Sequence, residues 1–179
     1  MKSFRGFSDV MTWAASGKRT YELRGGDEVV ATLRWPNGFG SPALGETAEG
    51  KIVIERSGLL RPRLVALDDL ATPSADPDAV ALSQRAPLLT LELDVGGRGA
   101  AQTRSGKKLD WVPRNLWRTA WAFEAAGRPL ITLQTEGALK FSHKVQVAPD
   151  DASPELGALL LLASAVGVYL TEDAAIFGL

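Results

Sequence analysis

The residues with the clearest chemical potential are basic and lie close together in the sequence. Between residues 98 and 118 the chain has six lysines and arginines, and Asp110 is the only acid among them. Basic side chains next to an anionic surface contribute about 1 kcal/mol each to binding. We therefore predict a site for anionic lipid headgroups, or for another anion, in this basic stretch. Its candidate ligand-binding residues are Arg104, Lys107, Lys108, Arg114 and Arg118, with Arg98 beside them in the sequence.

Two features bear on this prediction. Arg61 and Arg63 fall on the same face of a predicted strand and would extend the site. The competing interpretation is that strand alternation scatters the basic side chains over the surface, where charged residues protect exposed strands from aggregation. The sequence leaves both interpretations open.

A second pattern resembles a phosphate-binding loop. Gly45, Gly50 and Lys51 fit the spacing G-x-x-x-x-G-K. Such a loop requires Ser or Thr after the lysine and then a helix, whereas Ile52 follows here and opens a strand-like run. The pattern therefore predicts a hairpin turn at Glu49 and Gly50.

Few residues are suited to catalysis or metal binding. The 179 residues include no cysteine and one histidine, which excludes thiolate metal sites, cysteine nucleophiles and clusters of several histidines. His143 falls on the apolar face of a predicted strand, which favours a structural role. The acidic pairs lack the spacing of a calcium loop. We expect no catalytic residue, no metal ligand and no cofactor.

Composition points to one ordinary globular domain. The formal net charge is -1, and 45% of the residues are hydrophobic. A nucleic-acid-binding domain would carry a strong positive excess, so nucleic acid is not an expected partner. Charged and small residues interrupt the first seventeen residues, so they do not form a signal peptide, and we expect a cytoplasmic location.

Short alternating runs between turn signals dominate the chain and are typical of antiparallel β structure. The predicted strands cover 19–24, 27–35, 42–47, 50–56, 61–67, 79–84, 88–94, 98–104, 107–112, 117–124, 129–135 and 140–147. Residues 115–126 also fit a helix capped by Asn115, but the turn that follows favours a strand. All five tryptophans are predicted to pack inside the barrel: Trp13, Trp35, Trp111, Trp117 and Trp121.

The last element is a helix predicted over 154–172, with Ser153 as its N-cap and Pro154 in its first turn. Its segment 156–170 contains no charged residue. A membrane span needs about 20 apolar residues and basic flanks, whereas this segment is shorter and has acidic flanks. A helix that is apolar on all sides must be surrounded by protein. A barrel of about twelve strands is wide enough to contain it.

The predicted architecture is therefore all-β, an antiparallel barrel of about twelve strands that encloses the hydrophobic C-terminal helix. Residues 1–18 would form an N-terminal arm, and residues 19–179 a single barrel domain. The arm contains Phe4, Phe7, Val10, Met11 and Trp13, which would form an exposed apolar patch.

The helix segment Pro154–Leu170, preceded by Asp150 and Asp151, and the unit Trp117–Leu130 with its Gly127-Arg-Pro129 turn, resemble the tubby C-terminal-like superfamily. That group includes the LURP-one-related proteins and the phospholipid scramblases. The resemblance implies a twelve-stranded barrel around a central C-terminal helix. Tubby domains bind phosphoinositides through basic residues, but no individual binding residue of that group can be matched to a position here.

Two functional hypotheses follow. The first is a non-enzymatic module that binds anionic phospholipid or a membrane surface through the basic stretch. The alternative is a protein-interaction or structural module that forms an oligomer, or holds a protein partner, through the apolar arm.

Overall fold

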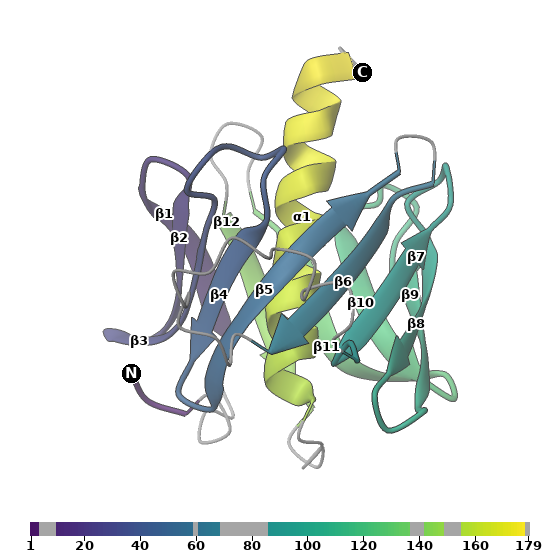
Figure 1. Ribbon diagram of the computed structural model, residues 1–179, viewed down its shortest axis with the longest axis horizontal. Helices are drawn as coiled ribbons and strands as arrows, with labels where there is room; N and C mark the ends of the chain where they lie inside the picture. Colours follow the sequence, from purple (N-terminus) through teal and green to yellow (C-terminus); the bar gives the residue numbers. More distant parts are fainter. Residues whose placement is uncertain (4–9, 59–60, 69–85, 137–141, 149–154, 178–179) are drawn as a thin grey trace, which may run out of the picture.

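A computed structural model describes residues 1–3, 10–58, 61–68, 86–136, 142–148 and 155–177, with side chains up to Leu170. Within these ranges the chain forms twelve strands and one helix (Figure 1). The elements are β1 (Met11–Gly17), β2 (Thr20–Gly25), β3 (Glu28–Arg34), β4 (Ala43–Thr47), β5 (Gly50–Ser57), β6 (Arg63–Asp68), β7 (Leu89–Leu93), β8 (Gly99–Thr103), β9 (Lys108–Pro113), β10 (Ala120–Ala125), β11 (Arg128–Thr135), β12 (Ser142–Val147) and α1 (Leu156–Phe177).

The strands form one closed antiparallel barrel in which neighbours in sequence pair with each other. The ring closes between the first and last strands, where Met11 lies opposite Val145 and Trp13 opposite His143. Closure removes the unpaired edges that make open sheets prone to aggregation. The predicted fold class, a twelve-stranded antiparallel barrel with a C-terminal helix, is confirmed.

The expectation that residues 1–18 form a separate arm is wrong for its second half. Residues 11–17 form β1, and Met11 and Trp13 are 1% and 0% exposed, so they belong to the core rather than to a surface patch. Val10 is 40% exposed, whereas Phe4 and Phe7 lie outside the described residues. The predicted strand 79–84 also lies outside them. The described residues form twelve strands, the number predicted, but the sequence pattern did not identify one of them, β1.

The ambiguous segment 115–126 forms a strand, but that strand begins at Ala120 rather than at residue 117. The side chain of Asn115 accepts hydrogen bonds from the backbone N–H groups of Thr119 (3.0 Å) and Ala120 (3.4 Å), which favours a turn here. Trp117 is therefore 86% exposed, and its predicted packing inside the barrel is wrong. The other four tryptophans are at most 6% exposed.

Helix α1 runs through the barrel (Figure 1). It contacts strands on opposite sides of the ring, β3 to β6 on one side and β10 and β11 on the other, and residues 155–169 are all buried. This explains why the helix lacks a polar stripe. It begins at Leu156, and the predicted cap residues Ser153 and Pro154 lie outside the described residues. In the described part of the chain, no helix has the length and hydropathy that crossing a membrane would need.

The helix passes close to the barrel wall at two glycines. A Cβ atom at Gly45 of β4 would lie 2.8 Å from Leu161 Cδ1, and one at Gly167 of the helix would lie 2.7 Å from Leu133 Cδ2. Both distances are shorter than carbon atoms tolerate. Because neither Gly45 nor Gly167 has a side chain, the helix can approach the barrel wall closely enough to fit inside it.

Because the strands alternate in direction, the loops alternate between the two ends of the barrel. The C-terminal half of the helix lies at the end that includes the described loop residues 18–19, 35–42, 58, 61–62, 94–98, 114–119 and 136. There a Cβ atom at Gly97 would contact Leu170, and the Trp35 indole contacts Tyr169. We call this the exit end, and the other the entry end.

Candidate functional site

The hairpins divide the basic stretch between the two ends of the barrel. Strands β8 and β9 pair with Gly99 opposite Trp111 and Gln102 opposite Lys108. Arg104 and Lys107 therefore lie in the loop at the entry end, whereas Arg98, Arg114 and Arg118 lie at the exit end. At about 3.4 Å per residue, a five-residue strand separates the two groups by roughly 15 Å. The six basic residues do not form one patch.

Several of the predicted binding residues, among them Arg104, Arg114 and Arg118, have partners within the protein. Arg114 Nη1 forms an ion pair with Glu124 Oε1 at 2.5 Å, and Arg104 Nη1 pairs with Asp68 Oδ2 at 2.9 Å. Arg118 Nη1 donates a hydrogen bond to the carbonyl oxygen of Gly96 at 3.1 Å. The ion pair of Arg104 with Asp68 is partly exposed and contributes less than about 1 kcal/mol. The Glu124 side chain is only 13% exposed, so solvent and salt screen its pair with Arg114 less.

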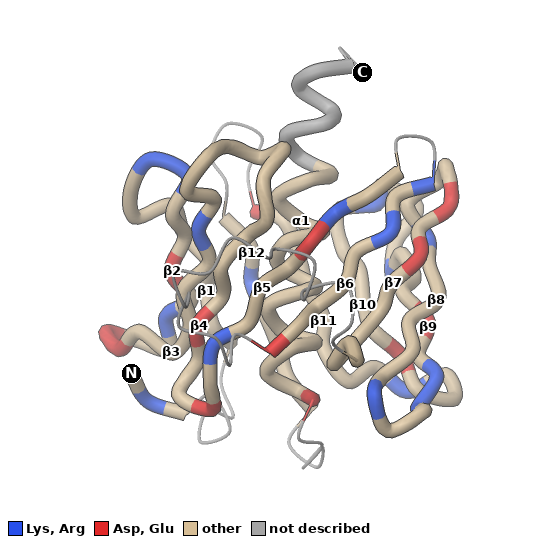
Figure 2. Tube along the Cα trace, viewed as in Figure 1, with Lys and Arg blue, Asp and Glu red and all other residues tan. Residues whose placement is uncertain are grey.

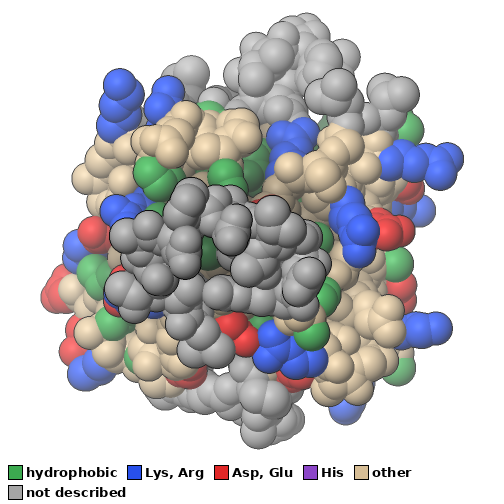
Figure 3. Space-filling view, viewed as in Figure 1, with side chains coloured by type: hydrophobic (Ala, Val, Ile, Leu, Met, Phe, Trp, Pro, Cys, Tyr) green, Lys and Arg blue, Asp and Glu red, His purple; other side chains and the backbone are tan. Residues whose placement is uncertain are grey.

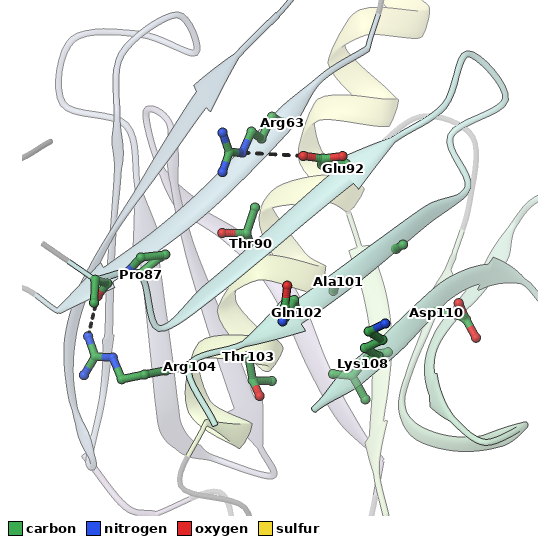
Figure 4. A pocket seen from close by; sticks show the side chains of 13 residues that line it. Arg63, Pro87, Thr90, Glu92, Ala101, Gln102, Thr103, Arg104, Lys108 and Asp110 are labelled. Atoms are coloured by element: carbon green, nitrogen blue, oxygen red, sulfur yellow. Dashed lines mark hydrogen bonds and ion pairs between the residues drawn. The ribbon is translucent and has the colours of Figure 1, made fainter. Parts of the chain in front are cut away.

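One shallow hollow of about 660 Å³ lies on the outer face of β7, β8 and β9 (Figure 4). Small outward side chains, such as Thr90 and Ala100, leave room there. Of the predicted binding residues, it contains Arg104 and Lys108. Its lining includes both basic and acidic groups, namely Arg63, Glu92, Arg104, Lys108 and Asp110.

A second hollow of about 780 Å³ adjoins the first at the exit end and shares Arg63 and Glu92 with it. Arg61 and Arg98 also line it, so three arginines from β6 and from the loops beside β6 and β8 converge here. We call it the arginine hollow. The structure thus brings Arg98 together with Arg61 and Arg63, rather than with Lys107 and Lys108.

The arginine hollow has two cations that are available for a ligand. The guanidinium groups of Arg61 and Arg98 are exposed and make no hydrogen bond or ion pair with any described residue. Arg63 Nε lies 3.8 Å from Glu92 Oε1. Asp94 holds the β7–β8 turn, because its Oδ1 accepts a 2.9 Å hydrogen bond from the Arg98 backbone N–H and its carbonyl accepts one from Gly97.

The two ends of the barrel differ in charge. Among the loop residues that the structure describes, the exit end has six basic and two acidic residues, and the entry end, with residues 1–3 and 155, has three of each. Figure 2 shows the distribution of these charges along the chain. In Figure 3, basic side chains project from the exit end, at the top of the view. Sequence reasoning missed this asymmetry, although counting strands would assign each loop to an end.

The pattern that resembles a phosphate loop has a structural role instead. Gly45 lies in β4 beside the helix, and Thr47 pairs with Gly50 across a tight hairpin, as predicted. Lys51 Nζ lies 3.7 Å from Glu46 Oε1. The segment after the lysine is strand β5, so no helix N-terminus faces this turn.

His143 is buried in the wall of β12 and is 1% exposed. Burial lowers its pKa from 6.5 to about 4, so the imidazole is neutral at pH 7. Its Nδ1 lies 3.1 Å from Thr135 Oγ1, and its ring lies beside Gly167 of the helix. The surroundings are those of a core residue between strand and helix. Among the described side chains, no group of three or more His, Asp or Glu is placed to hold a metal ion.

The comparisons with known proteins give no further guide to this site: no family model, no curated protein and no solved structure matches the chain.

Proposed function

We propose that this protein is a non-enzymatic binding module, and that the arginine hollow at its exit end binds anionic lipid headgroups. The observation that carries the proposal is that Arg61 and Arg98 line one hollow and neither guanidinium group has a partner among the described residues. The excess of basic loop residues at the same end supports it.

The chemistry of arginine fits a phosphorylated headgroup. The guanidinium group is planar, stays charged and donates two parallel hydrogen bonds to phosphate oxygens. Arg63 can add a third contact, because its pair with Glu92 is exposed and long at 3.8 Å. Binding of this kind is electrostatic and weakens as salt is added.

With this function we would expect the protein in the cytoplasm, bound peripherally to the anionic inner surface of a membrane. The architecture is also the one that the tubby C-terminal-like superfamily would lead us to expect. A relationship to that group remains a prediction, because it rests on the likeness of the helix and of one strand pair.

The test is flotation with vesicles of phosphatidylcholine and phosphatidylserine at low salt. We expect the double variant R61Q/R98Q to bind on the order of thirtyfold more weakly, since each arginine contributes about 1 kcal/mol. The matched control is K107Q/K108Q, which removes the same charge at the entry end. It also tests whether those two lysines bind the ligand, as the sequence predicts.

Equal losses in the two double variants would contradict the arginine hollow and indicate a diffuse effect of net charge. A larger loss in the lysine variant would place the site at the entry end. If the wild-type protein does not bind anionic vesicles, the proposal is wrong. The alternative function as an oligomeric interaction module has lost Met11 and Trp13 from its proposed surface, because both are buried.

A further inference from the structure

Exposed apolar side chains gather at the exit end, beside the arginine hollow. Among the described residues, five large hydrophobic side chains are exposed. Val95, Leu116 and Trp117 lie in two exit-end loops and are 86%, 97% and 86% exposed, whereas Met1 and Val10 precede β1. Single exposed apolar residues are common, but a group of three is not, and it indicates a binding surface.

The turn that carries Leu116 and Trp117 is ordered by its own hydrogen bonds. The Arg118 backbone N–H donates to the Asn115 carbonyl at 3.2 Å, and the Asn115 side chain bonds to Thr119 through both its amide nitrogen and its oxygen. Leu116 and Trp117 are therefore the two central residues of a closed turn. Their side chains extend into solvent, since they are 97% and 86% exposed.

Arg118 joins this turn to the other loop and to the core. Its guanidinium group bonds to the Gly96 carbonyl, next to Val95 and the arginine hollow. Its own carbonyl accepts a 2.8 Å hydrogen bond from the indole N–H of Trp121, which is 6% exposed. Its φ of 54° lies in the left-handed region, which non-glycine residues seldom adopt, and these bonds hold it there. The two apolar loop tips are thus fixed relative to each other.

We infer that Leu116 and Trp117, together with Val95, form an anchor that inserts into the interfacial layer of an anionic bilayer. Tryptophan concentrates in this layer because its ring is amphipathic. The basic residues around the anchor match the negative charge of the lipid surface. Stable attachment to a membrane takes two weak signals, and here the arginine hollow supplies one and the apolar turn the other. The inference rests on the proposed function and adds the orientation: the exit end faces the membrane.

Tryptophan fluorescence tests insertion directly. Trp117 is the one exposed tryptophan of the five, so its emission is obtained as the difference between the wild type and W117F. On addition of phosphatidylcholine–phosphatidylserine vesicles, we expect the Trp117 emission to shift to shorter wavelength. Lipids with brominated acyl chains should quench it. An unchanged Trp117 emission while the protein floats with the vesicles would overturn the anchor.

Binding by variants gives an independent readout. We expect L116S/W117S to bind the same vesicles about tenfold more weakly, since the two side chains lose their apolar burial. The matched control is V10S, which replaces an exposed apolar residue at the entry end, and we expect it to bind as the wild type does. Unfolding curves of all variants establish that each is folded.

The results separate the two proposals. If R61Q/R98Q weakens binding and L116S/W117S does not, the headgroup site stands and the anchor is wrong. If neither double variant weakens binding to the vesicles, both proposals are wrong. If light scattering shows a dimer that L116S/W117S dissociates, the apolar turn is an interface between copies of this chain, and the membrane anchor is overturned.

Discussion

The indole N–H of Trp35 donates a 2.9 Å hydrogen bond to the hydroxyl oxygen of Tyr169, so a residue just after β3 is tied to the helix inside the barrel. Both side chains are buried, and their rings meet edge to face with centroids 5.6 Å apart. The guanidinium group of Arg56 lies over the Tyr169 ring, with its central carbon 4.7 Å from the ring centre.

The first prediction concerns this bond. Y169F keeps the ring but leaves the buried indole N–H of Trp35 without its acceptor, which costs about 1–3 kcal/mol of unfolding free energy. Urea unfolding measures the loss. In the double variant W35F/Y169F no donor is left unsatisfied, so its loss should be smaller than the sum of the two single losses. Additive losses would mean that the hydrogen bond does not stabilise the fold.

The second prediction concerns the close approach of the helix at Gly45. G45A places a methyl group 2.8 Å from Leu161 Cδ1 and 3.2 Å from Ile52 Cγ1, both inside the core. Overpacking of this kind costs roughly 1–3 kcal/mol. The control is G40A, because a Cβ atom at Gly40 has no atom within 4 Å. Equal unfolding midpoints for G45A and the wild type would show that the helix can shift away from β4.

The third prediction is a loss of stability in mild acid. Burial lowers the pKa of His143 to about 4 in the folded barrel, below its ordinary 6.5. Between these values the unfolded chain binds a proton that the folded chain excludes, so stability falls as the pH drops from 6.5 to about 4. The full shift corresponds to about 3 kcal/mol.

H143Q tests this contribution, because the amide cannot titrate and can still hydrogen-bond to Thr135. The difference in unfolding free energy between wild type and variant should change between pH 7 and pH 4.5, with the wild type losing more. Comparing the two proteins at each pH cancels the titration of the carboxylates. A constant difference across this range would rule out His143 as the source.

The fourth prediction concerns the helix as the core of the barrel. Removal of residues 154–179 takes away the buried side chains of 155–169, against which the inward faces of the strands pack. We expect the truncated chain to be insoluble or to lose the near-ultraviolet circular dichroism of its buried tryptophans. A soluble truncation with the native spectrum would show that the strands form a stable barrel alone.

Much of this architecture follows from local patterns. Alternation marks strands such as Leu89–Leu93, whose odd-numbered residues face the core, and the apolar segment 156–170 predicts an enclosed helix. Strand β1 was missed because its sequence, MTWAASG, alternates only over Met11 and Trp13 before small residues begin. It pairs with its hairpin neighbour β2 on one side and with β12, at the far end of the strand series, on the other, and the long-range pairing leaves no local signal.

The candidate site was predicted less well, for a related reason. Nearness in sequence groups Lys107 with Arg114, but one strand separates them in space, whereas Arg61 and Arg98 are distant in sequence and line one hollow. Similarly, Trp117 lies at the same alternate spacing as Trp121 and Phe123, so the sequence pattern assigns all three to one face of a strand. The side chain of Asn115 closes a turn before the strand begins, so Trp117 falls outside it.

The closed ring around a helix that follows all twelve described strands in sequence constrains how the protein folds during synthesis. Residues 11–17 leave the ribosome before their partner strand β12 has been translated, and the helix that fills the lumen follows later still. Threading a finished helix through a sealed ring is a route that proteins avoid. We therefore expect the sheet to close around the helix only after the helix has been translated, which would leave the inward faces of the strands open to aggregation until then.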